Sequence, residues 1–305
     1  MKDKVITIAG PTAVGKTEFA IRLAKRIGGE IISADSMQAY RSMDIVSQKP
    51  TPKQRRAVPH HLIDMLDPGE EYSAAEFAKR ASALIEDIIK KSRIPLIVGG
   101  SGLYIKALIG GLFPSPKKDT DLRRRLEAEA KRFGKGRLHE KLKAVDPAAA
   151  DSIHPNDLRR IVRALEVYHL TGFPISQQKK KAEGIQKRFN VKRFGLIRPR
   201  DIIYKRIEER VEEMFAAGLV KEVQRIKKGK MSITASASVG YKEVSGYLAG
   251  EYSLREAKGL LKKNTRHLAK KQLTWFRADK DIAWIDIEKI SSKDAIEQIV
   301  KDISG

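Results

Sequence analysis

The chain contains no cysteine among its 305 residues, so neither disulfide bridges nor zinc sites with thiolate ligands can form. It also has no apolar run near the roughly 20 residues that a membrane span requires. The apolar stretch at residues 5–9 is too short for the hydrophobic region of a signal peptide. We therefore expect a cytoplasmic protein that does not bind membranes.

Acidic residues are scarce relative to basic ones, with 38 Asp and Glu against 61 Lys and Arg, a net charge of +23. Such a charge indicates either a polyanionic partner, bound through counterion release, or simply a solvated basic surface. Residues 116–193 contain 21 basic and 10 acidic residues and residues 194–280 contain 20 and 10, against 17 and 12 in residues 1–115. The excess of basic residues therefore lies after residue 115, and such a concentration of charge is typical of a binding face.

The first third of the sequence alternates between strand and helix patterns. Short apolar runs at 5–9, 30–34 and 94–98 predict buried strands, and helical spacing of apolar residues predicts helices at 18–27 and 73–91. Alternating strands and helices predict a parallel sheet covered by helices on both faces.

The strand pattern stops near residue 114 and returns only at 193–197. Helical patterns fill most of 119–182, and further helices are predicted at 201–228 and 253–277 before a last strand at 282–287. We therefore predict an α/β core formed by residues 1–115 and 194–305. Residues 116–193 form an all-helical insert in this interpretation.

A complete G-x-x-x-x-G-K-[ST] motif follows the first predicted strand and opens the first helix. Its residues are Gly10, Pro11, Thr12, Ala13, Val14, Gly15, Lys16 and Thr17. The glycines let backbone N–H groups surround an anion at the helix N-terminus, Lys16 adds a mobile positive charge, and the Thr17 hydroxyl can bind Mg²⁺. The motif predicts a polyphosphate site without saying which polyphosphate binds.

P-loop kinases and NTPases usually carry a second acidic residue for Mg²⁺ at the end of an apolar strand. The strand at 94–98 ends instead in Gly99-Gly100-Ser101-Gly102. The carboxylate that does follow a strand is Asp35, at the edge where a parallel sheet binds ligands. Asp35 could cap a helix, bind Mg²⁺ or accept a proton from a nucleophile, and its position alone leaves the three roles open.

Seven ordered blocks carry a resemblance to a known family. They are Gly10–Thr17 (GPTAVGKT), residues 35–40 (DSMQAY), 59–64 (PHHLID), 99–104 (GGSGLY), 154–157 with 163–167 (HPND, RALEV), 240–243 (GYKE) and 274–277 (TWFR). In this order and spacing the chain resembles the bacterial tRNA dimethylallyltransferases over nearly its whole length.

The resemblance implies a P-loop that binds the diphosphate of dimethylallyl diphosphate without transferring a phosphoryl group. The N6 amine of the adenine immediately 3′ of a tRNA anticodon would displace that diphosphate and give N6-isopentenyladenosine. Arg210 matches the family's catalytic arginine and Asp35 its general base, while Lys16 would bind the diphosphate directly and Mg²⁺ would bind at Thr17. Preorganised cations and amides of this kind stabilise negative charge on a leaving diphosphate.

The resemblance also implies contacts with the anticodon stem-loop. The matching residues are Asp35, Ser36, Met37, Gln38, Ser101, Arg123, Arg159, Arg163, Gly240, Tyr241 and Lys242. The insert, with its basic run at 179–181, would grip the stem-loop, and the protein is expected to be a monomer. Residues Arg255, Lys258, Lys262, Arg266 and Lys270 lie on one predicted helix face. In this context we interpret that stripe as a further phosphate contact rather than a solvated face.

Three departures from the family pattern concern the site. Ser101 replaces the usual threonine, Ala237 stands where many relatives have glutamine or arginine, and the segment around Ser47 differs, which leaves the role of Ser47 open. Two other functions remain as alternatives: an ATP-dependent P-loop kinase or NTPase acting on RNA, and a non-catalytic RNA-binding protein with a nucleotide switch. The missing second acidic motif argues against the first and the full set of site blocks against the second.

Overall fold

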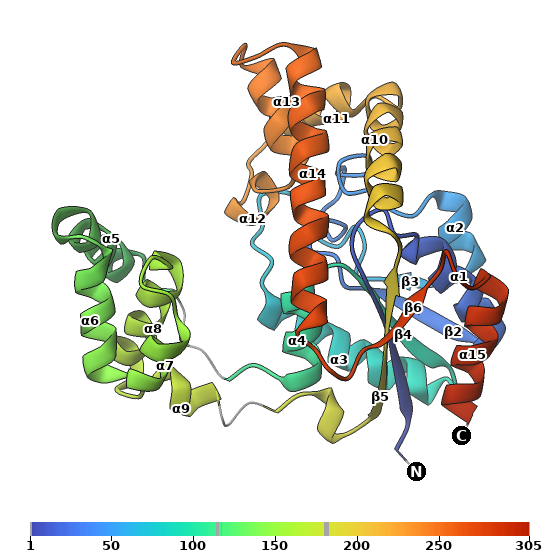
Figure 1. Cartoon of the computed structure of the whole chain (residues 1–305), viewed down its shortest axis with the longest axis horizontal. Coiled ribbons are helices and arrows are strands. Elements are labelled where there is room, and N and C mark those ends of the chain that lie inside the picture. The colour runs from blue at the N-terminus through green and yellow to red at the C-terminus, as the bar shows by residue number, and fades with distance from the viewer. Residues whose placement is uncertain (1, 114–115, 117, 180–182, 305) are drawn as a thin grey trace. The chain divides into compact units, whose positions relative to one another are not determined.

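The structure is a computed structural model and describes residues 2–113, 116, 118–179 and 183–304 (Figure 1). The chain forms two compact units, one of Met1–Ile109 with Ile185–Gly305 and the other of Gly110–Gly184. The predicted boundaries at 116 and 193 are therefore corrected. Residues 185–193 belong to the core because strand β5 (Asn190–Ile197) already pairs with β1 (Lys4–Ala9) from Asn190 onward.

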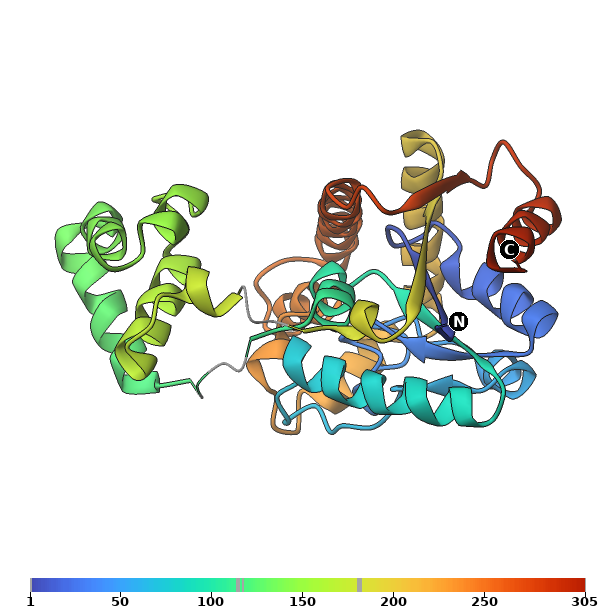
Figure 2. The same cartoon turned by 90° about the horizontal axis from the view of Figure 1, so that it is seen from below.

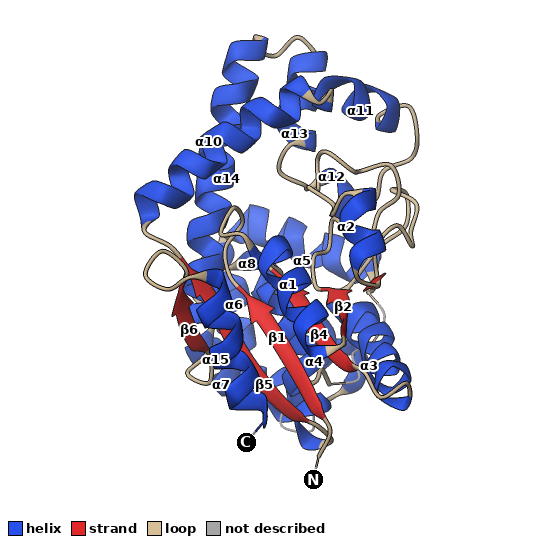
Figure 3. Cartoon of the chain, turned by 90° about the vertical axis from the view of Figure 1, so that its right-hand side faces the viewer, coloured by secondary structure: helices blue, strands red, loops and turns tan. Residues whose placement is uncertain are grey.

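The core contains a six-stranded sheet in the described part of the chain, with the order β3-β2-β4-β1-β5-β6 and every pair parallel (Figure 3). The other strands are β2 (Gly29–Ser33), β3 (His60–His61), β4 (Ile94–Gly99) and β6 (Ala283–Asp286). Each strand except β3 was expected from its apolar run. Strand β3 has two residues, both histidine, and so carries no apolar signal.

Two apolar clusters cover the opposite faces of the sheet, because successive strand residues point to opposite sides. Within β1, Val5 and Ala9 join one cluster and Ile6 and Ile8 the other. The first face is covered by α3 (Ala74–Lys90), α4 (Gly102–Gly110) and α14 (Leu254–Arg277), and the second by α1 (Lys16–Ile27) and α15 (Ser292–Ser304) (Figure 2). The predicted α/β fold with helices on both faces is confirmed.

Five further helices complete the core in the described part of the chain: α2 (Pro52–Ala57), α10 (Arg200–Ala216), α11 (Leu219–Ile226), α12 (Ile233–Ser236) and α13 (Tyr241–Leu248). The single helix predicted at 201–228 is wrong. It breaks at Gly218, whose φ of 98° is left-handed and suits glycine at the start of α11. A 3₁₀ turn, η1 (Ile185–Lys187), precedes β5.

The second unit is helical in its described part: α5 (Thr120–Phe133), α6 (Lys135–Val145), α7 (Pro147–Ser152), α8 (Leu158–Thr171) and α9 (Ile175–Lys179). Its apolar core includes Leu126, Leu138, Leu142, Ile161 and Leu165. The unit thus buries its own hydrophobic face, as an independent helical insert must. Among all described residues, no helix has the length and apolarity needed to cross a membrane.

Candidate active site

The P-loop connects β1 to α1 with a backbone that few other residue types could adopt. Gly10, Ala13 and Gly15 all have positive φ, of 149°, 62° and 104°. A Cβ on Gly10 would lie 2.7 Å from the Leu196 carbonyl oxygen of the neighbouring strand. The N-terminus of α1 has no side-chain cap, so its first backbone N–H groups are available to an anion.

Lys16 folds back over this loop. Its Nζ donates to the carbonyl oxygens of Gly10 at 2.9 Å and Pro11 at 2.8 Å. Burial lowers the pKa of Lys16 to about 8, an effect that Asp35 opposes and Arg210 reinforces. An anion bound in the loop would favour the charged form of this amine.

Three arginines that follow β5 donate hydrogen bonds to the loop, and two of them, Arg206 and Arg210, also line the cavity. Arg206 Nε donates to Ala13 O at 2.8 Å, and Arg198 Nε donates to Val14 O at 3.0 Å. Arg210 Nη1 donates to the Thr12 hydroxyl at 3.4 Å, which places the predicted catalytic arginine at the cradle. Burial and the nearby Arg206 lower the pKa of Arg210. Sequence analysis missed Arg206, although its spacing of one helical turn from Arg210 was a usable signal.

Asp35 lies immediately after β2 and lines the same cavity as the P-loop. Its Oδ1 accepts the Met37 N–H at 3.0 Å and so caps the turn that follows. Burial raises the pKa of Asp35, while the Met37 N–H and the charge of Lys16 act in the opposite direction. The Ser36 N–H donates to Ser101 Oγ at 3.3 Å, so two of the predicted blocks meet beside Asp35.

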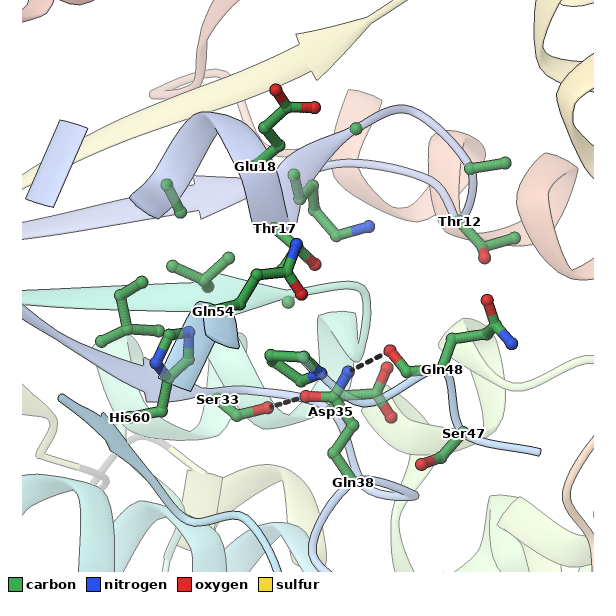
Figure 4. A pocket seen from close by; sticks show the side chains of 18 of the residues that line it. Thr12, Thr17, Glu18, Ser33, Asp35, Gln38, Ser47, Gln48, Gln54 and His60 are labelled. Atoms are coloured by element: carbon green, nitrogen blue, oxygen red, sulfur yellow. Dashed lines mark hydrogen bonds between the residues drawn. The ribbon is translucent and has the colours of Figure 1, made fainter. Parts of the chain in front are cut away.

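The cavity has a volume of about 250 Å³. Figure 4 shows Thr12 and Thr17 of the P-loop on one side and Asp35, Gln38 and Ser47 across from them. Neutral polar side chains line much of the remaining wall: Ser33, Gln38, Ser47, Gln48, Gln54 and His60. Of this set, sequence analysis predicted a site role only for Gln38 and left the role of Ser47 open. A cavity with an anion cradle at one side and amide and hydroxyl groups at the other suits a phosphate-bearing donor beside a polar, planar acceptor.

The wall at residues 44–48 is held by Glu222 of α11. The Glu222 carboxylate accepts the backbone N–H groups of Asp44, Ile45 and Val46 at 2.8–3.0 Å. Gln38 Nε2 donates to Gln48 O at 3.3 Å and its Oε1 accepts the Ser33 hydroxyl at 2.8 Å. Ser47, whose role the sequence left open, donates its hydroxyl to Met43 O and lines the cavity.

Comparison with known proteins identifies the family. A family model described as IPP transferase matches residues 38–279. The chain belongs to the IPP transferase family. The resemblance drawn from the seven sequence blocks is thereby confirmed.

Curated relatives of this family member align over nearly its whole length. The tRNA dimethylallyltransferase of Geobacter sulfurreducens is 47% identical over 287 residues, which cover 93% of this chain and 92% of the relative. The enzyme of the same name from Carboxydothermus hydrogenoformans is 47% identical over 305 residues, covering 99% and 97%. These relatives favour prenyl transfer over the kinase or NTPase alternative.

Two solved structures share the fold of this family member. The full-length tRNA isopentenylpyrophosphate transferase of Bacillus halodurans matches with a TM-score of 0.74 and 42% identity, covering 100% of this chain and 96% of that chain. A eukaryotic dimethylallyltransferase acting on tRNA matches with a TM-score of 0.83 and 28% identity, covering 99% and 80%.

The RNA-contact residues predicted in the core fall into two groups. Ser36, Gln38 and Ser101 lie beside Asp35, and Met37 belongs to the same turn. Gly240, Tyr241 and Lys242 lie at the start of α13, where the Gly240 N–H donates to Glu243 Oε2 at 2.7 Å. Lys242 is exposed and Tyr241 is buried. None of these three belongs to the described residues that line the cavity.

In the insert, Arg123 and Arg163 both bind the buried carboxylate of Glu166. Arg123 donates through Nε and Nη2 to the two Glu166 oxygens at 2.7 Å each, and Arg163 Nη1 also donates to Glu166. Their predicted contact with RNA stays a prediction, but the structure adds an internal role. Arg159 is exposed on α8. Of the basic run at 179–181, Lys179 ends α9 and the other two residues lie outside the described residues.

The basic stripe on α14 also has partners that the sequence did not indicate. Lys258 and Lys262 bind Glu212 at 2.6 and 2.7 Å, and Arg266 binds Glu208 at 2.8 Å. Both acids lie on α10, so these three cations pair two packed helices. Their predicted phosphate contact is untested, and the ion pairs give them a structural role as well.

Thr17 lines the same cavity as Asp35. Across the described residues, no group of three or more His, Asp or Glu side chains is arranged to hold a metal ion. A protein cage for a cation is therefore lacking in that part of the chain. A Thr hydroxyl at a phosphate cradle nevertheless fits Mg²⁺, which keeps several waters and is held largely by substrate phosphates.

Proposed function

We propose that this family member transfers the dimethylallyl group of dimethylallyl diphosphate to N6 of the adenine immediately 3′ of a tRNA anticodon. The observation that carries the proposal is the placement of Asp35 and the P-loop in one cavity. The names of its relatives, tRNA dimethylallyltransferases, support the choice of donor and acceptor.

The chemistry follows from the two sides of the cavity. The N6 lone pair attacks C1 of the allylic donor, the C1–O bond breaks, and its electron pair leaves with the diphosphate. The P-loop amides, Lys16 and Arg210 stabilise the negative charge that develops there. Asp35 accepts the N6 proton. Burial raises the pKa of Asp35, which brings this base nearer to the value at which general-base catalysis is most efficient at neutral pH.

Thr17 would hold Mg²⁺ together with the diphosphate, and the bound ion would supply further positive charge to the leaving group. We also propose that the Gly110–Gly184 unit binds the anticodon stem-loop, because residues 110–184 contain 17 basic against 10 acidic residues.

An ATP-dependent kinase or NTPase is the weaker alternative. Strand β4 ends at Gly99 and is followed by Gly100-Ser101-Gly102, so the position next to the P-loop that usually carries the second Mg²⁺ carboxylate has none. The cradle can bind a polyphosphate without this residue, but phosphoryl transfer loses its metal ligand.

One experiment separates these functions. The protein is incubated with labelled dimethylallyl diphosphate and an unmodified anticodon stem-loop, and the label is located by nuclease digestion and mass spectrometry. A matched stem-loop with inosine in place of the target adenine lacks the N6 amine and should stay unlabelled. Absence of label in the adenine stem-loop, together with RNA-stimulated release of phosphate from ATP, would overturn the proposal in favour of the kinase or NTPase.

A further inference from the structure

Gln272, near the C-terminal end of α14, bridges two loops that are distant in sequence. Its Oε1 accepts the backbone N–H of Thr12 in the P-loop at 2.8 Å. Its Nε2 donates to the carbonyl oxygen of Gly100, after β4, at 3.1 Å. One partner is a donor and the other an acceptor, so the orientation of the side-chain amide is fixed by its neighbours.

The loop after β4 is shaped to receive this helix. A Cβ on Gly100 would lie 2.4 Å from Gln272 Nε2, and a Cβ on Gly102 would lie 2.2 Å from the Trp275 ring. Both distances are far below a van der Waals contact, so the Gln272 amide and the Trp275 ring can lie where they do only because residues 100 and 102 are glycine. The two glycines flank Ser101.

Each end of the Gln272 bridge is one further hydrogen bond away from a residue that the proposed reaction uses or from its neighbour. On the donor side, the Thr12 hydroxyl accepts from Arg210 Nη1 at 3.4 Å. On the acceptor side, Ser101 Oγ accepts the N–H of Ser36, the residue next to Asp35, at 3.3 Å. Gln272 therefore joins the loop that carries the cationic cradle to the loop that supports Asp35.

We propose that Gln272 is a positioning residue that sets the separation between the diphosphate cradle and the Asp35 loop, an assignment that rests on the proposed function. It does not touch the reacting atoms in this arrangement. The Thr12 N–H is already bonded to Gln272, so anion binding falls to the amides closer to the start of α1. Loss of the bridge should therefore disturb the alignment of the two substrates more than the affinity for either.

The variant Gln272→Met keeps the length of the side chain and removes both hydrogen bonds. At saturating donor and RNA, the single-turnover rate should fall by about tenfold or more, because misplacement of reacting groups by a fraction of an ångström to 1 Å can cost up to about 100-fold. The dissociation constants for inorganic diphosphate and for the stem-loop should change by less than about threefold. Gln224→Met, at an exposed position of α11, is the matched control and should behave as wild type.

A second pair of variants tests the bridge itself. Gly100→Ala would displace Gln272 Nε2, so its effect on rate should not add to that of Gln272→Met in a double-mutant cycle. Gln272→Glu keeps an acceptor for Thr12 and sets a carboxylate oxygen against Gly100 O. It should also lose rate, and it replaces Gln272→Met in the test should the latter fail to fold, as judged by thermal unfolding.

The outcomes are distinguishable. Three outcomes would each overturn the positioning role: an unchanged rate for the Gln272 variants, fully additive losses with Gly100→Ala, or a loss confined to diphosphate affinity. As long as the wild-type protein still transfers the label, these outcomes leave the proposed function intact. Wild-type protein that labels no RNA would overturn the proposed function, and with it this assignment.

Discussion

Asp35 and Lys16 line one cavity, and the charge of each affects the protonation of the other. Burial raises the pKa of Asp35 and lowers that of Lys16 to about 8, and the charge of each partly offsets the effect of burial on its neighbour. Both shifts bring groups that usually titrate far from neutrality closer to it. Because both pKa values lie closer to neutrality, the roles of Asp35 as a base and of Lys16 as a phosphate-binding cation can be tested by varying the pH.

Asp35→Asn should preserve the fold of the site, because asparagine Oδ1 can still accept the Met37 N–H. It cannot accept the amine proton, so the single-turnover rate should fall by about 10²–10⁴-fold with little change in the affinity for either substrate. The wild-type rate should rise with pH through the raised pKa of Asp35, and this limb should vanish in the variant.

Lys16→Ala is the contrasting variant for Asp35→Asn. It should weaken donor binding as well as turnover, because its charge meets the diphosphate before and during reaction. If Asp35→Asn kept near-normal chemistry and lost donor or metal affinity, Asp35 would be a metal-site residue and the proposed mechanism would be wrong.

The lowered pKa of Lys16 predicts a pH dependence of donor binding. Above about pH 8 the free protein loses the charge that the diphosphate binds, so affinity should fall as pH rises and binding should take up protons. Calorimetry in buffers of different ionisation enthalpy measures this uptake. Lys16→Arg stays charged and should lose the dependence, and comparison at equal pH cancels the titration of the ligand itself. The same pH dependence in both proteins would contradict the assignment.

At the scale of elements, two buried glutamates, Glu222 and Glu166, each join segments that lie far apart in the sequence. Glu222 of α11 binds three consecutive N–H groups of the 44–46 turn and so shapes the cavity wall. Glu166 of α8 joins α5 and the segment before it through Arg123 and the Asp119 N–H. In both cases a carboxylate that would be costly to bury alone is stabilised by several donors.

Glu166→Gln should destabilise the insert by up to about 3–5 kcal/mol, because it leaves two partly buried arginines facing a neutral partner. Urea unfolding measures the loss, and hydrogen exchange in α5 and α8 localises it. Glu140→Gln, an exposed position on α6, is the control and should change stability little. Equal effects of the two substitutions would contradict the structural role of Glu166.

The pH dependence of stability has a defined sign at Glu166. Burial raises the pKa of this carboxyl, but the hydrogen bonds from Arg123, Arg163 and the Asp119 N–H outweigh it and lower the pKa to about 2. The stabilisation is therefore complete above the ordinary value of 4.5 and is lost as pH falls from there through about 2. Glu166→Gln should flatten stability in this window.

For the whole molecule, basic residues exceed acidic ones by 23, and some of the cations are paired within the fold, as between α14 and α10. Exposed cations of the insert are the better candidates for phosphate contact. Arg159 lies exposed on α8, whereas the basic run at 179–181 includes residues outside the described part of the chain.

Affinity for the stem-loop should fall steeply with salt, and Arg159→Glu should reduce the log–log slope by about 0.9 per lost duplex contact, or about 0.7 for a single strand. Lys25→Glu on α1 makes the same charge change at an exposed site of the core and should leave the slope closer to that of wild type. A complex insensitive to salt, or one affected equally by both reversals, would mean that the insert does not bind the RNA backbone.

The sequence by itself determined the features that depend only on neighbours along the chain. The spacing of Gly10, Gly15 and Lys16 defines the cradle, and apolar runs define β1, β2 and β4. Helical spacing identifies an insert without strands. Asp35 and Arg210 needed the family pattern as well, because neither a lone carboxylate nor a lone arginine on a charged helix is distinctive.

Only the tertiary structure decided which side chains meet across long sequence separations. Gln272 bonds to Thr12 across 260 residues, and Glu222 to Val46 across 176. The break at Gly218 depends on a left-handed backbone that glycine permits but does not require. Such contacts leave no periodic signal, because they arise where helices pack against loops. Folding brings the two residues of each contact together, and no pattern in the sequence around either residue indicates the other.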